Sequence, residues 1–255
     1  MSDPRFFVAG EFEGAPGDVV DLVLGAADRH HALDVLRLGV GDRLVAIGPD
    51  GAARTVELVT CGPDILTARI IATEPPPAEP DVTLVQGLGK GAKMDLVVEK
   101  AVELGVRSIV PVVFKRSVAR PDAERGARRT ERWRRVALAA AKQSRRTFVP
   151  GVSEPQGFSG FLARLADYDR CVVLWEDEPG TTFSSAMEGL GATARVAVVV
   201  GPEGGFTAEE VAALRERGCV TASLGATVLR TETAGIVAAA LCLYELGGLG
   251  GRSRG

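Results

Sequence analysis

Residues 195–240 constrain the fold most strongly, because they contain two segments that each have the pattern of strand, loop and helix. The first segment joins an apolar strand at 195–200, through the loop 201–206, to a helix. The second places the long connection 224–234 between a short strand and a very apolar helix. Loops at the ends of two neighbouring strands, each leading into a helix, form the usual ligand site of an α/β sheet. The sequence therefore predicts an α/β fold with a small-molecule site at these two loops.

The loop 201–206 has the composition of a ligand-binding turn, Gly-Pro-Glu-Gly-Gly-Phe. Glycine lets the backbone approach a ligand closely and take positive φ angles. The next residues, 207–210, have the pattern of a capping box, and the exposed amides of a helix start could bind an anion or a carboxylate. An ordinary strand-to-helix turn is the alternative. So much glycine after a fully apolar strand favours the ligand loop.

A proline-rich segment at 73–80 indicates a domain boundary. Its four prolines in eight residues can continue neither a strand nor a helix and make a stiff spacer. Before it, short strands at close spacing suggest a small β-barrel, with helical spacing over residues 28–38. We therefore expect a first domain at 1–72, a linker at 73–80 and a second domain at 81–250.

The second domain begins with a strand, a glycine turn and a helix, which invites comparison with nucleotide-binding folds. The turn at 87–91 fails the G-x-G-x-x-G spacing, because Ala92 stands where the third glycine is required. It also lacks the G-K-[ST] unit of a P-loop. The sequence favours a plain turn between strand and helix, which leaves Lys90 and Lys93 free to contact phosphate.

The segment 115–146 is strongly basic. It holds twelve Lys or Arg against three acids, so it carries +9 while the rest of the chain carries −12. A basic segment in an otherwise acidic protein is an electrostatic footprint for a polyanion, here RNA or DNA, although a solvated helix face is the alternative. Arginine predominates, which suits bidentate contacts to phosphate. Trp133 within it could be a core anchor or a stacking platform.

Several classes of protein are disfavoured. The opening residues have no signal-peptide pattern, and no apolar run reaches the roughly 18 residues of a membrane span, so we expect a cytoplasmic protein without membrane contact. The four cysteines form no CxxC pair, and His30 and His31 have no further ligand paired with them. We therefore expect no metal site and no disulfide.

The last predicted helix is apolar nearly all round over residues 234–243. A helix without a polar face must be covered on every side. In a domain of this size, that predicts a subunit interface in addition to the local core, and hence a homodimer.

The two loops, Gly-Pro-Glu-Gly-Gly-Phe at 201–206 and Leu-Arg-Thr-Glu-Thr-Ala at 229–234, resemble the cofactor loops of the SPOUT methyltransferases. Within that superfamily the chain is most similar to the 16S ribosomal RNA (uracil-N3)-methyltransferases. Matches at Lys90, Lys93 and Arg116 and around residues 100–106 and 143–150 extend the resemblance over about the whole chain. Lys115 and Lys142 stand where the family often has acids, which adds positive charge.

The resemblance implies a PUA-like β-barrel that binds RNA, followed by a SPOUT α/β domain with a deep trefoil knot. It implies S-adenosylmethionine bound in the knotted loops of a homodimer. The expected reaction is methylation of uridine N3 at one site in the decoding region of 16S rRNA, in or near the assembled small ribosomal subunit.

The resemblance also assigns candidate residues. The expected cofactor-binding set is Leu174, Gly201, Pro202, Glu203, Gly204, Gly205, Leu224, Gly225, Leu229, Thr233 and Ala234. The expected RNA-binding set is Arg37, Lys90, Lys93, Arg116, Arg145 and Arg146.

The chemistry adds two candidate catalytic residues, Arg230 and Glu232. Uracil N3 must lose its proton before it can accept a methyl group, and negative charge then spreads onto O2 and O4. We expect Arg230 to stabilise that charge, while Glu232, Glu203 and water remain candidates for the proton acceptor.

Two rival functions come from other classes. A non-catalytic RNA-binding or ribosome assembly module would use the barrel and the basic segment but bind no cofactor, so a cofactor titration separates it from an enzyme. A nucleotide-dependent oxidoreductase is disfavoured by the failed G-x-G-x-x-G spacing.

Overall fold

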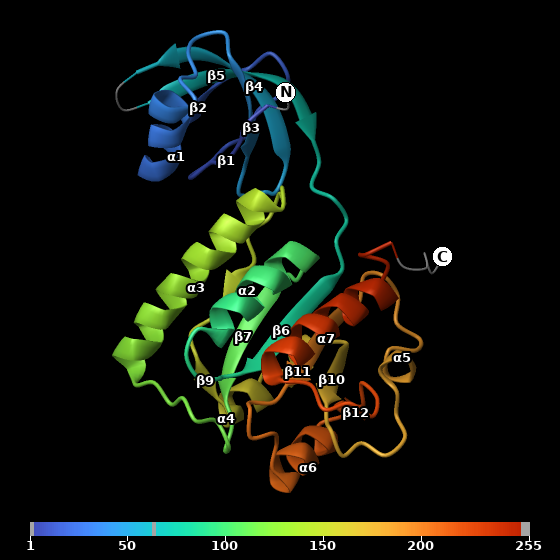
Figure 1. Cartoon of the computed structure of the whole chain (residues 1–255). Coiled ribbons are helices and arrows are strands. Elements are labelled where there is room, and N and C mark those ends of the chain that lie inside the picture. Colours follow the sequence, from blue (N-terminus) through green and yellow to red (C-terminus); the bar gives the residue numbers. More distant parts are fainter. Residues whose placement is uncertain (1–2, 63–64, 251–255) are drawn as a thin grey trace. The chain divides into compact units, whose positions relative to one another are not determined.

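The computed structural model describes residues 3–62 and 65–250, which form two compact units (Figure 1). The first unit runs to Ala78 and also includes residues 142–148; the second holds 79–141 and the chain from Val149 onward. The return of 142–148 to the first unit has no counterpart in the sequence pattern. Met1 and Ser2, on which the expectation about a signal peptide partly rests, lie outside the described residues.

The first unit contains a five-stranded sheet in the order β1-β3-β4-β5-β2. The strands are β1 (Arg5–Phe7), β2 (Val19–Leu22), β3 (Arg43–Ile47), β4 (Ala53–Cys61) and β5 (Leu66–Glu74). β1 runs parallel to β3, and the other pairs are antiparallel. A bridge between Val8 and Leu24 joins the residues that follow β1 and β2 at the two edges of this order. β5 extends into the segment predicted as linker.

Alternating side chains of these strands form the core of the first unit, with Phe6, Leu44 and Ile70 fully or almost fully buried, and Phe12 joins them from the connection between β1 and β2. The predicted helix at 28–38 is present in a modified form. It begins as α1 (Ala26–His30) and continues as a π-helical turn over His31–Val35.

The second unit is a parallel sheet in the order β12-β10-β11-β6-β7-β8, with β9 also paired to β7. Its strands are β6 (Asp81–Gly87), β7 (Ser108–Val113), β8 (Gly151–Val152), β9 (Gln156–Gly157), β10 (Arg170–Leu174), β11 (Arg195–Val200) and β12 (Val220–Ala222). The central strands β6 and β11 are buried almost throughout. Such continuous apolar runs are typical of parallel strands covered on both faces.

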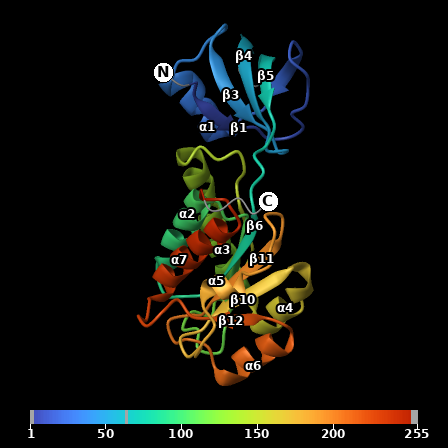
Figure 2. The same cartoon turned by 90° about the vertical axis from the view of Figure 1, so that its right-hand side faces the viewer.

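Helices cover both faces of this sheet (Figure 2). They are α2 (Lys93–Leu104), α3 (Ala123–Gln143), α4 (Phe158–Leu162), α5 (Phe183–Ala186), α6 (Ala208–Glu216) and α7 (Thr231–Glu245). α2 and α7 pack against each other, and α7 contacts β6 and β11. Phe161, Val211 and Leu214 bring α4 and α6 into the core on the sheet face lined by Val85, Val173 and Val199.

On one side of α7 the side chains of Ala238, Ala239, Cys242 and Leu243 are buried, whereas Leu241 and Tyr244 are exposed. No helix in the described part of the chain is long and apolar enough to cross a membrane.

Candidate functional site

A pocket of about 470 Å³ lies at the carboxyl ends of β10, β11 and β12. The sequence predicted two loops from neighbouring strands, and this detail is wrong, because β10 lies between β11 and β12. The loop after β10 therefore forms a third wall, with Trp175 and Glu176. Local sequence patterns do not report which strand is inserted between two others, so only Leu174 of this wall was predicted.

The loop after β11 is fixed by packing against the end of β6. A Cβ atom added to Gly87 would lie 2.3 Å from the Pro202 nitrogen and 2.5 Å from the Gly201 carbonyl carbon. Gly89 leaves space for the Glu203 side chain, whose Oε1 would be 2.9 Å from an added Cβ. Gly87 and Gly89 thus admit another loop of the same protein at close range, which explains these two glycines without a nucleotide.

A buried hydrogen-bond chain joins β6 to the loops after β11 and β12. Gln86 Nε2 donates to Thr231 Oγ1 at 2.8 Å, and the Thr231 hydroxyl donates to the Gly201 carbonyl oxygen. Gly235 on α7 leaves room for this amide, because a Cβ atom there would lie 2.3 Å from Gln86 Oε1. The start of α7 is therefore held against the loop after β11.

The helix after the first loop begins with the predicted capping box. Thr207 Oγ1 accepts from the Glu210 amide, and Glu210 Oε2 accepts from the Thr207 amide. Glu210 Oε1 also accepts from the Lys115 amide at 2.7 Å, so the cap is tied to the segment after β7. Gly205, inside the loop, has φ +68°, a conformation that favours glycine.

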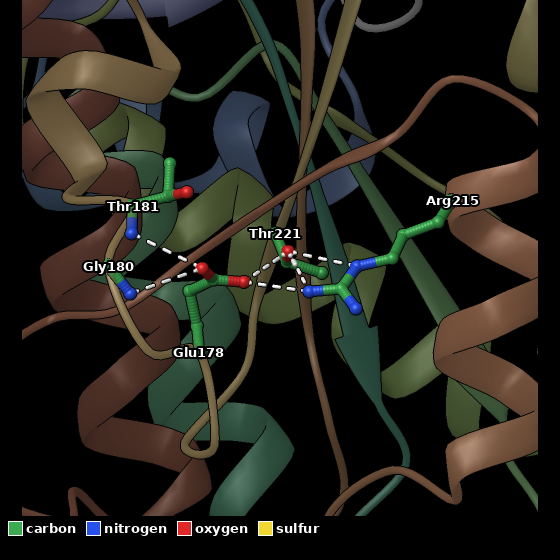
Figure 3. Close-up of polar contacts among 5 residues, drawn as sticks. All are labelled: Glu178, Gly180, Thr181, Arg215 and Thr221. Atoms are coloured by element: carbon green, nitrogen blue, oxygen red, sulfur yellow. Dashed lines mark hydrogen bonds and ion pairs between the residues drawn. The ribbon is translucent and has the colours of Figure 1, made fainter.

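The loop after β10 is anchored by the carboxylate of Glu178 (Figure 3). Glu178 accepts from the Gly180 and Thr181 amides, from the Thr221 hydroxyl, and from Arg215 Nη2 at 2.8 Å. The hydrogen bond from Thr221, with those from the amides, lowers the pKa of Glu178 to about 2 against the opposing effect of burial. The Arg215 guanidinium lies 4.9 Å from the Trp175 ring centroid, so this network supports a pocket wall.

Charged groups from separate elements meet at the pocket. Lys93 Nζ lies 3.3 Å from Glu203 Oε1 and 3.2 Å from Glu232 Oε2. Burial raises the pKa values of both carboxyls, but backbone hydrogen bonds and Lys93 outweigh it, so both pKa values lie below their ordinary range. Glu232 and Glu203 raise the pKa of Lys93 through its hydrogen bonds to them. All three groups therefore stay charged near neutral pH.

Most of the predicted cofactor residues do line the pocket. Those that do are Leu174, Gly201, Pro202, Glu203, Gly205, Leu224, Gly225, Leu229 and Ala234. Gly204 and Thr233 are not among the lining residues. Gly204 instead packs on Arg116, whose Cβ and carbonyl oxygen would be 2.9 and 3.1 Å from an added Cβ. Arg230, the N-cap residue of α7, lines the pocket. Glu232 does not line the pocket, but it pairs with Lys93, which does.

The predicted RNA-binding residues separate into different environments. Arg37, Lys90, Arg116 and Arg145 are exposed, Lys93 lines the pocket, and Arg146 is only 7% exposed. A side chain so buried presents little surface to a phosphate, and nothing in the charge pattern distinguishes Arg146 from Arg145. Sequence reasoning missed the lining residues Trp175 and Glu176, which no local signal marked. It did place Phe206 and residues 226–228 in the two predicted ligand loops, and these residues line the pocket.

Within the described residues, no group of three or more His, Cys, Asp or Glu side chains could hold a metal ion. Cys61, Cys171, Cys219 and Cys242 are all free thiols.

Known proteins resemble this chain over most of its length. The RNA methyltransferase domain family matches residues 76–243. Ribosomal RNA small subunit methyltransferase E of Bacillus subtilis is 34% identical over 85% of this chain and 87% of that protein. The protein of the same name from Mycobacterium tuberculosis is 36% identical over 85% and 83%. The crystal structure of a ribosomal RNA small subunit methyltransferase E from Neisseria gonorrhoeae bound to S-adenosyl methionine has a TM-score of 0.77, with 28% identity over 94% of this chain and 96% of that one.

Proposed function

Because the chain belongs to the family of the ribosomal RNA small subunit methyltransferases E, we propose that it methylates N3 of one uridine in 16S rRNA with S-adenosylmethionine. The observation that carries the proposal is the pocket at the ends of β10, β11 and β12, which contains nine of the eleven residues that the family resemblance assigned to the cofactor. The decoding region of the small subunit is the proposed target.

The residues present fit S-adenosylmethionine. A volume of about 470 Å³ lies in the range of small-molecule sites. Leu174, Val200 and Leu229 provide apolar walls, and Glu176 and Glu203 provide negative charge that suits a sulfonium. Gly225 has φ +105° and an added Cβ there would meet no atom within 4 Å, so the backbone borders open space. A ligand could approach that backbone closely.

S-adenosylmethionine, when bound, supplies an electrophilic methyl group. The protein must then position the uracil in line with it and stabilise the charge that spreads onto O2 and O4 when the N3 proton leaves. Arg230 is suited to that task, because it lines the pocket and a guanidinium offers positive charge with several hydrogen-bond donors in one plane.

The proton acceptor remains a choice among Glu203, Glu232 and water. Glu203 lines the pocket, whereas Glu232 is not a lining residue and pairs with the lining residue Lys93. The lowered pKa of each carboxyl makes it a weak base but keeps it ionised and ready to accept a proton.

Three further proposals concern architecture and assembly. The bridge between Val8 and Leu24 supports closure of the first sheet into a PUA-like barrel that binds RNA. The family resemblance supports a trefoil knot in the second unit, formed by the segment that includes the pocket loops. Leu241 and Tyr244 are large hydrophobic residues of α7 that are exposed in the single chain, and a partner subunit that covers them would form a homodimer. Light scattering of the purified protein would test this. A cytoplasmic location follows from action on the ribosome.

The decisive experiment incubates the protein with methyl-labelled S-adenosylmethionine and small ribosomal subunits that lack the modification, then maps the label by nuclease digestion and mass spectrometry. We expect a single 3-methyluridine in 16S rRNA. RNA binding without label transfer would favour the rival, a non-catalytic RNA-binding or assembly module. Label at another atom or in another RNA would contradict the proposed substrate. Naked 16S rRNA in a parallel reaction separates the free RNA from the assembled subunit as substrate.

A further inference from the structure

Lys93 is an unusual residue for the start of a helix. It is the first residue of α2, where the helix dipole presents its positive end and favours acids over cations. The local electrostatics of α2 therefore disfavour a lysine at this position. A residue that is locally unfavourable indicates a role outside its own element.

That role is visible in the contacts of the Lys93 ammonium. It lies 3.3 Å from Glu203 in the loop after β11 and 3.2 Å from Glu232 in the first turn of α7. The side chains of Lys93, Glu203 and Glu232 are 36%, 26% and 14% exposed, so solvent only partly screens the pairs. One cation thus joins the two loops that contribute most of the pocket's lining residues.

Lys100 on the same helix provides a contrast. It lies 2.8 Å from Glu99 and 2.9 Å from Glu103, so it too has two carboxylate partners and similar exposure. Its partners, however, belong to α2 itself, and it does not line the pocket. The two lysines therefore share their chemistry and differ in what they connect.

We propose that Lys93 is a positioning residue for methyl transfer, whose ammonium holds Glu203 on the pocket wall and links it to Glu232 beside Arg230, so that the two cofactor loops keep one geometry. This inference rests on the proposed function and replaces the expectation that Lys93 contacts phosphate. Two carboxylates already surround the ammonium, which leaves it poorly suited to attract a further anion.

The ionic contacts of Lys93 with Glu203 and Glu232 are a second connection between these loops, in addition to the hydrogen-bond chain from Gln86 through Thr231 to Gly201. That chain joins the same two loops at their buried base, whereas Lys93 joins them at the pocket surface. Loss of Lys93 should therefore leave the fold intact and loosen the pocket.

The experiment compares Lys93→Met with the matched control Lys100→Met, and with Lys93→Arg as a conservative rescue. Calorimetry with S-adenosylmethionine and steady-state methyl transfer to small subunits are measured for each protein, with thermal unfolding as a check on folding. We expect Lys93→Met to bind S-adenosylmethionine about tenfold more weakly and to raise the KM for it, with the KM for RNA unchanged. Lys93→Arg should recover most of the affinity, and Lys100→Met should match the unmodified protein.

A double-mutant cycle keeps the test informative if Lys93→Met unfolds. Glu203→Gln preserves the shape of its side chain and removes the ionic link, so it should weaken cofactor binding by itself, and the double variant with Lys93→Arg should bind no better than Glu203→Gln alone. Cofactor affinity equal to that of Lys100→Met in every Lys93 and Glu203 variant would overturn the inference. So would a change confined to the KM for RNA, which would return Lys93 to phosphate binding. Failure of the unmodified protein to bind S-adenosylmethionine or transfer methyl would instead overturn the proposed function.

Discussion

The pocket and helix α3 both concentrate charged residues, but most ion pairs of α3 are local, although Arg132 pairs with Asp95 of α2, whereas the pairs at the pocket join separate elements. On α3 the pairs Arg128–Glu124 and Arg134–Glu131 join residues three or four positions apart, and both partners are exposed. At the pocket, Lys93 joins Glu203 and Glu232, which come from separate elements. Exposed local pairs contribute only about 0–1 kcal/mol each and can be exchanged for another anion. Helix α3 is therefore suited to a long polyanion, and the pocket to one small ligand in a fixed geometry.

The same difference applies to packing. The end of β6 touches the loop after β11 through the backbone at Gly87, and it touches the start of α7 through the buried amide of Gln86. An added side-chain atom at either contact would therefore have no room. The arginines of α3 extend into solvent from a helix that is anchored on its other side by the buried Trp133 and Ala137. Substitutions at the pocket should consequently alter fold or catalysis, and those on α3 only binding.

The largest effect is expected for Gly87→Ala. The new methyl group would overlap the backbone of Gly201 and Pro202, so the loop after β11 must move. We expect a loss of about 3 kcal/mol in the free energy of unfolding, and loss of cofactor binding. Urea unfolding measures the first. Gly151→Ala is the control, because an added Cβ there meets no atom within 4 Å. Equal stability of both variants would show that Gly87 and the loop after β11 are not in contact as described.

Arg230→Ala should have the next largest effect, on chemistry alone. Removal of a group that stabilises charge in the transition state lowers kcat by about 10²–10³. Because backbone and apolar groups line most of the pocket, affinity for S-adenosylmethionine should be retained. Single-turnover methyl transfer and calorimetry measure the two quantities. Full activity of this variant would remove Arg230 from the mechanism.

A smaller and more graded effect is expected on α3. Arg125, Arg128 and Arg135 are exposed and fall on one side of the helix by their spacing. Their joint replacement by Gln should weaken RNA binding and make the plot of log affinity against log salt shallower by about 0.7–0.9 for each phosphate that is no longer neutralised. Cofactor affinity should not change. Arg164→Gln with Arg195→Gln, two exposed arginines elsewhere, is the control. An unaltered salt slope would exclude this face as the RNA site.

The smallest effect is expected at Glu178. Its pKa is lowered to about 2 in the folded protein, so it binds fewer protons there than in the unfolded chain, where the ordinary value is 4.5. The stability that it contributes is therefore present above about pH 4.5 and is lost as the pH falls toward 2. Glu178→Gln should flatten the pH dependence of unfolding in that window. The exposed Glu216 provides the control Glu216→Gln, and identical acid profiles for the two variants would contradict the assigned role of the network.

The sequence predicted those features that depend on local pattern. The apolar run 195–200 is β11, and the cap at Thr207 is present. Features that depend on strand order were not predictable. Trp175 enters the pocket because β10 lies between β11 and β12, and no residue near Trp175 encodes that neighbour relation.

Charge patterns showed a similar limit. The excess of arginine at 115–146 was visible in the sequence, but the burial of Arg146 was not, because burial depends on what packs above a residue. The glycines at 87–91 predicted a plain turn between strand and helix. Gly87 and Gly89 in fact admit residues 201–203 of the same chain at close range, a long-range contact that composition alone could not indicate.

The most direct test of the central claim, that the three loops form a site for S-adenosylmethionine, is calorimetry on the purified protein and on Gly205→Val. Gly205 lines the pocket at φ +68°, and a Cβ atom there would lie 3.1 Å from Glu176 Oε1, so a branched side chain must distort the wall. We predict micromolar binding to the unmodified protein and none to Gly205→Val, with Gly151→Ala unaffected. Absence of binding to the unmodified protein, alone and with small ribosomal subunits present, would contradict the claim, as would equal binding to Gly205→Val.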